Sequence, residues 1–573
     1  MTSYFNVQGQ KKRIKIIIWL FVLLFFAVIS RLYYLQVYKH SYYVNIASSQ
    51  HLSKDTIPAK RGQIYVYDTV SGNPYLLASN QTLNLVFVDP SEVENKEVTA
   101  DKLASILNLK KEDILASINV ASLYVPLKHK LSESESQQIK ASGLKGVGLI
   151  PEYWRYYPEN TLACSILGFV DAEGVGKYGL EEYFNQELSG TPGQSKEETD
   201  NIGVKIVFGE NVLTPAKDGS SLYLTLDRYI QGKAEALLAE AVTRFNADSG
   251  TVIVMDSSTG KILAMANNPV FDPNKYTEIK ENDYSVFKNK AITDSYEPGS
   301  IFKVITMAAG LDSGMITPET TYEDTGSLVI DGNKIMNSDK KTNGIQTMTN
   351  VLEKSLNTGT TWVEQKLGKN LFYEYLQKFG FGKITGIEFF NEATGILLGI
   401  DELNNHGFAT VSFGQSISTT PLQMITAFSA VANGGTMMKP YIIDKIVGND
   451  GDVTETAPKE VAKVISEESA KDLTTMMISV VNNGHGMQAK VAGYKIAGKT
   501  GTAQVVKEDG TGYESNKNIG TFIGFSPTEG ADFVVLAKID NPKNVAWAES
   551  TAAPIVGSML DFLLKYYNVP PTE

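Results

Sequence analysis

The longest run of apolar residues lies near the N-terminus, at residues 16–29. A helix of this length is shorter than the hydrocarbon layer of a bilayer, which is about 30 Å thick. Lys15 and Arg31 flank the run, and both can bury their stems while keeping their charges at the interface. A pair of tyrosines follows at interfacial depth. The pattern therefore predicts a transmembrane anchor over residues 16–38.

A cleaved signal peptide is the alternative for this segment, because its apolar core can be this short. No small-x-small cleavage site follows the run, and no cysteine is near enough for lipid attachment. We therefore expect an uncleaved anchor. Basic residues precede the run and no acidic residue occurs before Asp55, so residues 1–15 should stay in the cytoplasm. The rest of the chain would then lie outside the cytoplasmic (inner) membrane.

Between the anchor and residue 220 the pattern is short and irregular. Residues 83–88 have the composition of a β-strand, and residues 102–107 and 111–118 have the spacing of short amphipathic helices. Glycine and proline interrupt the segment often. No cluster of acids, thiols or hydroxyls marks a reaction centre. We therefore predict a mixed α/β domain with a structural or docking role, which we call the pedestal.

From about residue 220 the periodicity becomes longer and more regular. A strand at residues 222–226 precedes a helical pattern at 228–245 and two strands at 250–256 and 261–266. A hairpin next to a helix predicts helices packed around an antiparallel sheet, which is an α+β fold. Further helices are expected at residues 301–311, 348–365, 421–431 and 466–481, and late strands at 522–525 and 533–539.

The length of 573 residues is too great for one ordinary domain. The patterns divide the chain into a cytoplasmic tail, an anchor, a pedestal, an α+β domain and a disordered tail, at residues 1–15, 16–38, 39–220, 221–568 and 569–573.

Composition removes several classes of function. The net charge is −12 and no basic cluster follows the N-terminus, which argues against a nucleic-acid partner. The five histidines are scattered, with no HExxH and no Cys/His cluster, so no metal site is indicated. No Walker or Rossmann glycine pattern points to ATP or NADH. The one cysteine, Cys164, can form no internal disulfide and is expected to be a buried free thiol.

Candidate chemistry begins with the motif Ser-x-x-Lys at Ser300 and Lys303. Pro298 and Gly299 precede it and an apolar helical pattern follows, which places Ser300 near a helix N-terminus. Residues three apart share a helix face, so the lysine amine can reach the serine hydroxyl. A lysine that is partly desolvated and near other cations can be neutral enough to act as its base.

Two further motifs follow in the chain. Ser355 and Asn357 form Ser-x-Asn, whose hydroxyl and amide could relay a proton and hold a substrate amide, although a turn or helix cap is the simpler interpretation. Lys499 begins Lys-Thr-Gly-Thr within a strand-like stretch. There Gly501 permits close approach of a ligand to a sheet edge, and the two threonines with the ammonium group suit a carboxylate.

The order Ser-x-x-Lys, Ser-x-Asn, Lys-Thr-Gly, with leading residues 55 and 144 positions apart, is far more specific than any one motif. A closely similar trio is found in penicillin-recognising enzymes. The sequence resembles the transpeptidase domain of penicillin-binding proteins over about residues 220–568. The resemblance extends to residues 250–256, 260–266, 379–382, 414–415, 420–423 and 432–435.

The pedestal resembles that of class B penicillin-binding proteins more loosely, through residues 61–64 and 179–181. One departure is clear. The family usually has an Asp-Arg pair after Arg-Gly-x-Ile, whereas Val66 and Tyr67 stand here. The absence of C-terminal modules looks more like the division or sporulation branch than the elongation branch. No glycosyltransferase domain fits in residues 39–220, so a bifunctional enzyme is not expected.

The resemblance implies a peptidoglycan D,D-transpeptidase, with stem peptides ending in D-Ala-D-Ala as donors and β-lactams as inhibitors. Ser300 would be the nucleophile and Lys303 its base, while Ser355 would pass the proton to the leaving D-alanine. Lys499 would support that relay. No metal or organic cofactor is implied.

The same resemblance assigns the binding residues. Asn357 would orient the acyl peptide, and Thr500 and Thr502 would hold the terminal carboxylate beside Gly501. The backbone N–H groups of Ser300 and Thr502 would form the oxyanion hole.

Several alternatives stay open at this point. A β-lactamase or a D,D-carboxypeptidase shares the trio but uses water as the acceptor, and a β-lactam sensor or scaffold would only bind. The family also implies a membrane partner, a polytopic glycan polymerase of the SEDS type, with other proteins of the divisome or the elongation complex. Nothing in the anchor identifies that partner.

Overall fold

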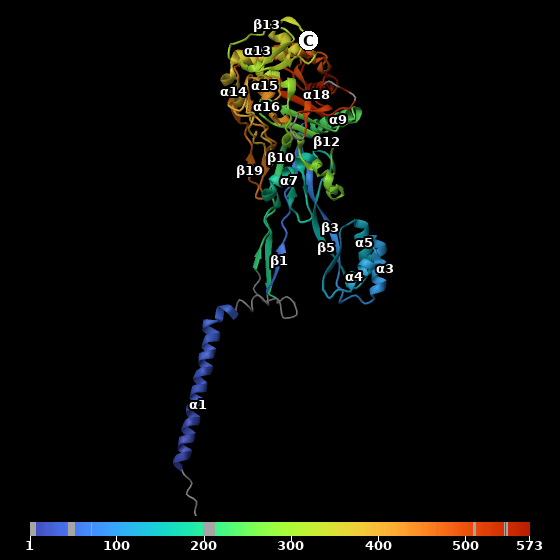
Figure 1. Cartoon of the computed structure of the whole chain (residues 1–573). Helices are drawn as coiled ribbons and strands as arrows, with labels where there is room; N and C mark the ends of the chain where they lie inside the picture. Colours follow the sequence, from blue (N-terminus) through green and yellow to red (C-terminus); the bar gives the residue numbers. More distant parts are fainter. Residues whose placement is uncertain are drawn as a thin grey trace, which may run out of the picture. The chain divides into compact units, whose positions relative to one another are not determined.

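The computed structural model describes residues 7–43, 52–69, 71–198, 212–507, 512–543, 545 and 548–572 (Figure 1). The chain divides into two compact units. The first contains Met1–Ala59 and Thr191–Asp218, and the second contains Lys60–Gly190 and Gly219–Glu573. The second unit contains the three candidate catalytic motifs and the two motifs of the pedestal.

The first unit contains the apolar helix. Helix α1 (Val7–Tyr33) continues through a π-helical turn, η1 (Tyr34–Tyr38). Lys11–Tyr38 is the one helix in the described part of the chain that is long and apolar enough to cross a membrane. Trp19 and Leu23 on it are more than 70% exposed, as expected for side chains that face lipid. The helix predicted over residues 16–38 is confirmed, and its character fits an anchor.

The first unit also contains a three-stranded antiparallel sheet, in the order β1 (Leu52–Ile57), β8 (Gly193–Glu198) and β9 (Val212–Thr214). We predicted no strands in these segments, because the alternation of charged and apolar residues in them is weak.

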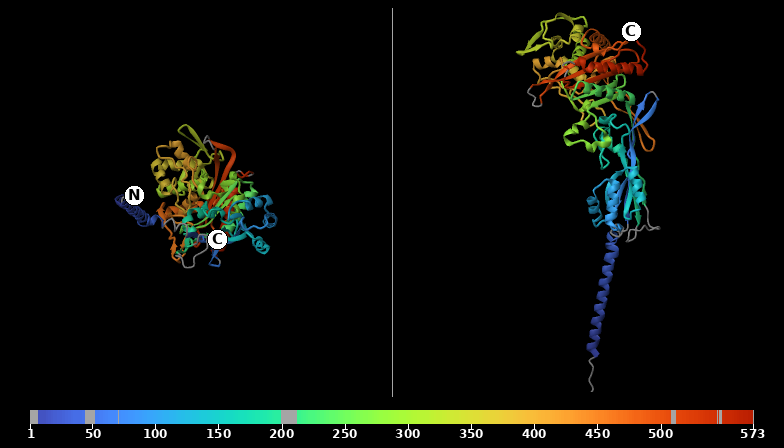
Figure 2. Two further views of the ribbon diagram at one scale, coloured as in Figure 1. Left: turned by 90° about the horizontal axis from the view of Figure 1, so that it is seen from below. Right: turned by 90° about the vertical axis from the view of Figure 1, so that its right-hand side faces the viewer.

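The pedestal is built on the long strand β3 (Asn73–Val88). Its first half pairs with β2 (Ile64–Asp68), and its second half pairs with β4 (Val125–Leu131) and β5 (Val147–Tyr156). Short helices gather at the end of β3 and β5 that is far from the catalytic domain (Figures 1 and 2). They are α3 (Lys96–Leu107), α4 (Lys111–Ile118) and α5 (Glu133–Ser142).

Strand β2 also joins the pedestal to the rest of the second unit. It pairs in parallel with β10 (Ser221–Asp227), whose other edge carries β18 (Ile443–Val447) and then β19 (Val453–Glu455). The sheet thus crosses the domain boundary expected near residue 220, and that boundary stays a prediction.

A buried ionic cluster joins distant segments of the pedestal. Glu181 is fully buried and accepts hydrogen bonds from Arg61 Nε and Arg155 Nε, each at 2.6 Å. Tyr157 donates a third at 3.3 Å. Burial alone would raise the pKa of Glu181, but the charges of Arg155 and Arg61 lower it below its usual value. The two pedestal motifs singled out in the sequence therefore meet at one ion pair.

The catalytic domain contains a five-stranded antiparallel sheet in the order β12-β11-β23-β22-β21. Its strands are β11 (Ser249–Asp256), β12 (Ile262–Asn268), β21 (Ala497–Val506), β22 (Tyr513–Phe525) and β23 (Phe533–Asp540). Strand β21, which carries the Lys-Thr-Gly motif, is an edge strand. The predicted helices around an antiparallel sheet are confirmed.

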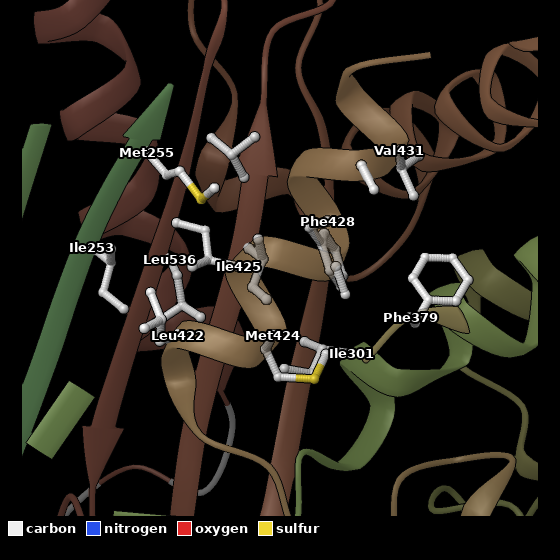
Figure 3. Close-up of a cluster of buried hydrophobic side chains, with 14 of the residues drawn as sticks. Ile253, Met255, Ile301, Phe379, Leu422, Met424, Ile425, Phe428, Val431 and Leu536 are labelled. Atoms are coloured by element: carbon white, nitrogen blue, oxygen red, sulfur yellow. The ribbon is translucent and has the colours of Figure 1, made fainter. Parts of the chain in front are cut away.

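Both faces of this sheet are buried, as β11 shows. Val252 and Val254 belong to the cluster formed with α9 (Arg228–Arg244) and α18 (Ala552–Tyr566). The alternate residue Ile253 belongs to the opposite cluster. Side chains of α16 (Pro421–Ala432), together with Met255, Leu536 and Ile301, fill that second cluster (Figure 3). Since Ile301 follows Ser300 directly, this packing helps to position Ser300.

Two predictions need correction. Residues 348–365 are not one helix, because α12 (Met348–Glu353) ends before Ser355 and α13 (Asn357–Leu367) begins after it. The last residues are not a free tail either. Val569 is buried, its carbonyl accepts a hydrogen bond from Tyr494, and the Thr572 N–H donates to Gly493. Glu573 lies outside the described residues.

The predicted buried thiol is confirmed. Cys164 is free and only 3% exposed, and it packs in a cluster with Phe169, Phe271 and Phe287. Burial raises the pKa of this thiol to about 12.

We expect Glu181→Ala to destabilise the protein by about 3–5 kcal/mol, because it leaves two buried guanidinium groups without a counter-charge. Since pairing lowers the carboxyl pKa, this stabilisation is present at neutral pH and is lost as pH falls through the folded-state pKa. Urea-induced unfolding followed by tryptophan fluorescence measures the change. Glu94→Ala is the matched control, because the Glu94 pair with Lys145 is exposed. Equal midpoints for both variants would contradict the proposed role.

Candidate active site

Ser300 lies in a tight turn that two glycines make possible. The turn η4 (Gly299–Phe302) leads directly into helix α11 (Lys303–Asp312). Gly299 has φ = +60°, and its N–H donates to the carbonyl of Gly414 at 3.0 Å. A Cβ atom on Gly414 would lie 2.2 Å from the Gly299 oxygen, so this backbone contact requires glycine. The nucleophile is therefore held by backbone contacts on one side and by the buried Ile301 on the other.

Lys303 is fully buried at the start of α11. Its Nζ atom donates to the hydroxyl of Ser355 at 3.2 Å and to the carbonyl oxygen of the same residue. Within the described part of the chain, no hydrogen bond joins Nζ directly to Ser300. The structure thus brings Lys303 to the Ser-x-Asn motif, and Ser355 is the group through which it is held.

Ser355 adopts a left-handed backbone, with φ = +55°, between α12 and α13. This conformation is uncommon for a residue other than glycine. It is stabilised by the Leu356 N–H, which donates to Val351 at 2.9 Å, and by the burial of Leu356. Backbone strain of this kind clusters at functional sites, where the surrounding structure over-determines it. Here it places the serine hydroxyl between two lysines.

Lys499 is the second lysine. It is fully buried on β21, and its Nζ atom donates to Ser355 Oγ at 3.1 Å and to the carbonyl of Thr500 at 3.1 Å. Burial lowers the pKa of Lys499 to about 7, against the opposing effect of the Glu549 carboxylate. Burial, and then the charge of Lys499, lower the pKa of Lys303 well below its usual value. Both effects favour the neutral amine of Lys303.

The turn at Ser300 packs directly on the edge strand β21. A Cβ atom on Gly501 would lie 2.9 Å from the carbonyl oxygen of Pro298 and 3.1 Å from the backbone nitrogen of Ile301. Likewise, a Cβ atom on Gly299 would lie 3.1 Å from the carbonyl oxygen of Thr502. The absence of side chains at both positions lets the nucleophile and the strand edge face one small space.

That space is a pocket of about 220 Å³. It is lined by Ser300, Ser338, Asp339, Lys354, Ser355, His485, Thr500, Thr502 and Glu549. Four predicted site residues therefore meet there, and Ser355 connects them to the buried pair Lys303 and Lys499. The three sequence motifs converge in one place.

Asn357 is placed differently from the other predicted residues. It does not line the pocket, and its side-chain amide donates to the carbonyl of Met336 at 2.9 Å. Next to it, Thr358 donates to the buried carboxylate of Asp324 at 2.8 Å, and Asn337 donates to the same group. These bonds tie the start of α13 to the segment that leads to Ser338. In this structure Asn357 therefore orders the pocket wall.

Sequence reasoning missed five of the nine lining residues: Ser338, Asp339, Lys354, His485 and Glu549. His485 had been grouped with the scattered histidines. The one available signal was its place between Gly484 and Gly486. Glycines on both sides of a polar residue indicate a tight turn, yet they do not indicate which pocket the turn reaches. In the described part of the chain no group of three or more potential metal ligands occurs.

Comparisons with known proteins match both domains. A model of the penicillin binding protein transpeptidase domain matches residues 250–561, and one of the penicillin-binding protein dimerisation domain matches residues 56–224. The chain is 34% identical over 572 residues to stage V sporulation protein D of Bacillus subtilis, covering 98% of this chain and 87% of that protein. It is 28% identical over 580 residues to peptidoglycan D,D-transpeptidase FtsI of Escherichia coli, covering 98% and 94%.

Solved structures give the same result. Penicillin-binding protein 3 of Mycobacterium tuberculosis in complex with aztreonam has a TM-score of 0.70 and 26% identity, covering 91% of this chain and 98% of that one. Penicillin-binding protein 2X of Streptococcus thermophilus has a TM-score of 0.75 and 25% identity, covering 90% and 81%.

We expect Gly501→Ala to slow acylation of Ser300 by about 10²-fold, because the added Cβ pushes the turn at Ser300 away from β21 and small displacements of reacting groups cost this much. The rate of labelling by a fluorescent β-lactam measures it. Gly232→Ala on α9 is the control, since its Cβ would meet nothing within 4 Å. Unchanged labelling of the Gly501 variant would show that this contact does not set the geometry.

Proposed function

Because the chain belongs to the class B penicillin-binding proteins, we propose that Ser300 is the nucleophile with which it cross-links peptidoglycan stem peptides as a D,D-transpeptidase. The observation that carries this assignment is the single hydroxyl of Ser355, which accepts hydrogen bonds from both Lys303 and Lys499 at the edge of the pocket that Ser300 lines. A hydroxyl shared by two amines can receive a proton from one side and release it on the other.

In the first half-reaction, Ser300 Oγ attacks the carbonyl carbon between the two terminal D-alanines of a donor stem. Lys303, neutral because its pKa is lowered, takes the serine proton, directly or through the Ser355 hydroxyl. The C–N bond then breaks, and Ser355 delivers a proton to the departing D-alanine amine. The backbone N–H groups of Ser300 and Thr502 stabilise the oxyanion, at about 3 kcal/mol for each donor.

The donor carboxylate is recognised by the strand edge. Thr500 and Thr502 line the pocket and supply hydroxyl donors, and the buried charge of Lys499 lies behind them. Gly501 keeps this edge close to the nucleophile. Asn357 retains one amide hydrogen beyond the one it gives to Met336 and can donate it to the acyl peptide.

In the second half-reaction, the amine of a neighbouring stem attacks the ester carbonyl, which forms the cross-link and frees Ser300. A β-lactam resembles the D-alanine pair and acylates the same serine. Its remaining ring blocks the approach of an amine, so the ester persists.

The apolar helix supports anchoring in the cytoplasmic membrane. The basic residues before it favour a cytoplasmic N-terminus, which leaves the catalytic domain outside. The names of the relatives favour work at the septum or in sporulation. The family relation favours a polytopic SEDS-type glycan polymerase, with other proteins of the divisome or the elongation complex, as partners. The exposed apolar side chains of α1 provide a surface for helix pairing in the membrane.

Ser300→Ala should abolish the covalent penicillin adduct, detected by intact-protein mass spectrometry, while the protein stays folded. Ser338→Ala, which removes another hydroxyl from the same pocket, should keep the adduct. A stoichiometric burst with a stable ester is expected. Rapid turnover would indicate a β-lactamase, and a stable ester without cross-linking would indicate a sensor. An adduct on the Ser300→Ala variant would remove this serine from the mechanism.

Lys303→Arg should reduce acylation by at least 10³-fold, because a guanidinium stays protonated and cannot accept the serine proton. In the unaltered protein, the acylation rate should fall as pH is lowered through the Lys303 pKa, since the neutral amine is the active form. Stopped-flow labelling across pH measures both effects. A Lys303→Arg variant that acylates normally would show that another group is the base.

A further inference from the structure

We propose that His485 is the general base for the attacking amine in the second half-reaction, and that Glu549 is the residue that positions it. This assignment rests on the proposed transpeptidase function and extends it to the acceptor. In the first half-reaction Lys303 and Ser355 handle the protons, so neither His485 nor Glu549 carries a proton there.

The pair lies in the same pocket as the nucleophile. His485 Nδ1 and Glu549 Oε2 are 2.9 Å apart, and both residues line the pocket with Ser300. Among the described residues that line this pocket, Glu549 is the one carboxylate within hydrogen-bonding distance of His485. A carboxylate that holds one ring nitrogen leaves the other nitrogen free to exchange a proton, which is the arrangement that orients a catalytic imidazole.

The backbone around His485 is fixed by close packing. A Cβ atom on Gly484 would lie 2.6 Å from the carbonyl oxygen of Glu353, and one on Gly486 would lie 3.0 Å from Cα of Val481. Glu353 is the last residue of α12, two positions before Ser355, and its carboxylate accepts a hydrogen bond from Ser479 of α17 (Glu467–Asn483). The histidine turn is therefore anchored to the segment that carries the proton relay.

Glu549 belongs to the side of the pocket that contains β21. It lies in the turn η6 (Ala548–Ser550), which contacts β21. Its carboxylate also opposes the lowering of the Lys499 pKa, so its charge acts on the strand edge that binds the donor. The His485–Glu549 pair thus connects the relay segment with β21 across the pocket.

The proposed bases of the two half-reactions, Lys303 and His485, differ in solvent exposure. The side chains of Lys303 and Lys499 are fully buried, whereas those of His485 and Glu549 are 54% and 38% exposed. The donor acylates Ser300 inside the pocket, but the acceptor amine must arrive from solvent after D-alanine has left. A half-exposed imidazole can meet that amine, while a buried lysine can be reached only through Ser355.

The proton balance is as follows. The neutral acceptor amine attacks the ester carbon, the C–N bond forms, and His485 takes one proton from the nitrogen, whose acidity rises as it becomes amide-like. The bond between carbon and Ser300 Oγ breaks, and Ser355 passes a proton from the protonated lysine of the buried pair to that oxygen. The imidazolium then releases its proton to solvent, and the lysine takes one up. The net products are an amide and a free serine.

Other charged groups face the same space. Asp339 and Lys354 approach from the segment that leads to Ser355, and Lys499 approaches from β21. All of these charged groups can affect the rate of the whole reaction. The measured quantity is therefore the ratio in which the acyl-enzyme reacts with amine and with water at a fixed acceptor concentration. Groups that act only in acylation do not change this ratio.

The experiment uses the full-length protein with a thioester analogue of the donor stem and a stem peptide that carries a free side-chain amine. His485→Gln should lower the ratio of aminolysis to hydrolysis at least tenfold, because a positioned general base contributes about 10²–10⁴-fold. Glu549→Gln should lower it several-fold, and Glu549→Asp, which keeps a carboxylate at this position, should restore most of the ratio. Added imidazole should restore aminolysis to a His485→Ala variant in proportion to its concentration.

His129→Gln is the matched control, because His129 forms a similar pair with Glu152, at 3.0 Å, on the pedestal. Its aminolysis ratio should equal that of the unaltered protein. The proposal is overturned if His485→Gln keeps the ratio within twofold, or if acylation by fluorescent penicillin falls as much as aminolysis. Absence of any acyl-enzyme in the unaltered protein would instead contradict the transpeptidase function itself.

Discussion

The catalytic half of this protein depends on one hydroxyl that is shared by two buried amines. Ser355 accepts hydrogen bonds from Lys303 and Lys499, and neither lysine is accessible to solvent. Burial of two such groups side by side opposes protonation of both, so their pKa values fall. Burial of both lysines costs folding free energy, and in the proposed mechanism this cost is what makes a neutral amine available as a base. The left-handed backbone conformation of Ser355 adds a further cost to the folding free energy.

This arrangement needs a rigid frame, and backbone packing supplies it. The turn at Ser300 is pressed between Gly414 and Gly501, where any Cβ atom would collide with main-chain atoms. Beneath it, helix α16 and the sheet bury Ile301 (Figure 3). On the pedestal side, Glu181 joins Arg61 and Arg155 and holds together segments that are more than a hundred residues apart in the chain. Preorganisation thus comes mainly from contacts that leave no room for adjustment.

The sequence was most informative where chemistry is local or periodic. The α+β class, the apolar N-terminal helix and the strands of the five-stranded sheet followed from apolar spacing, and the three motifs were identified from their order and spacing. Apolar spacing predicted one helix across Ser355, while the motif alone suggested a turn or a helix cap. No glycine or proline marks the break, and the lysines that donate to Ser355 are distant in sequence. Asn357 donates to Met336, a contact that the sequence did not indicate, and its role toward the acyl peptide stays a prediction. His485 and Glu549 are 64 residues apart and meet only through the fold. Tertiary contact, which leaves no local signature, accounts for each of these differences.

The buried cysteine has a practical consequence. A thiol that is almost inaccessible, and whose pKa is raised to about 12, contains negligible thiolate at neutral pH. It should resist maleimides and disulfide exchange, so the natural chain behaves toward such reagents as if it lacked cysteine. A single cysteine introduced on the surface could therefore carry a fluorophore or spin label without prior removal of Cys164, and distances within the working enzyme could be followed by spectroscopy.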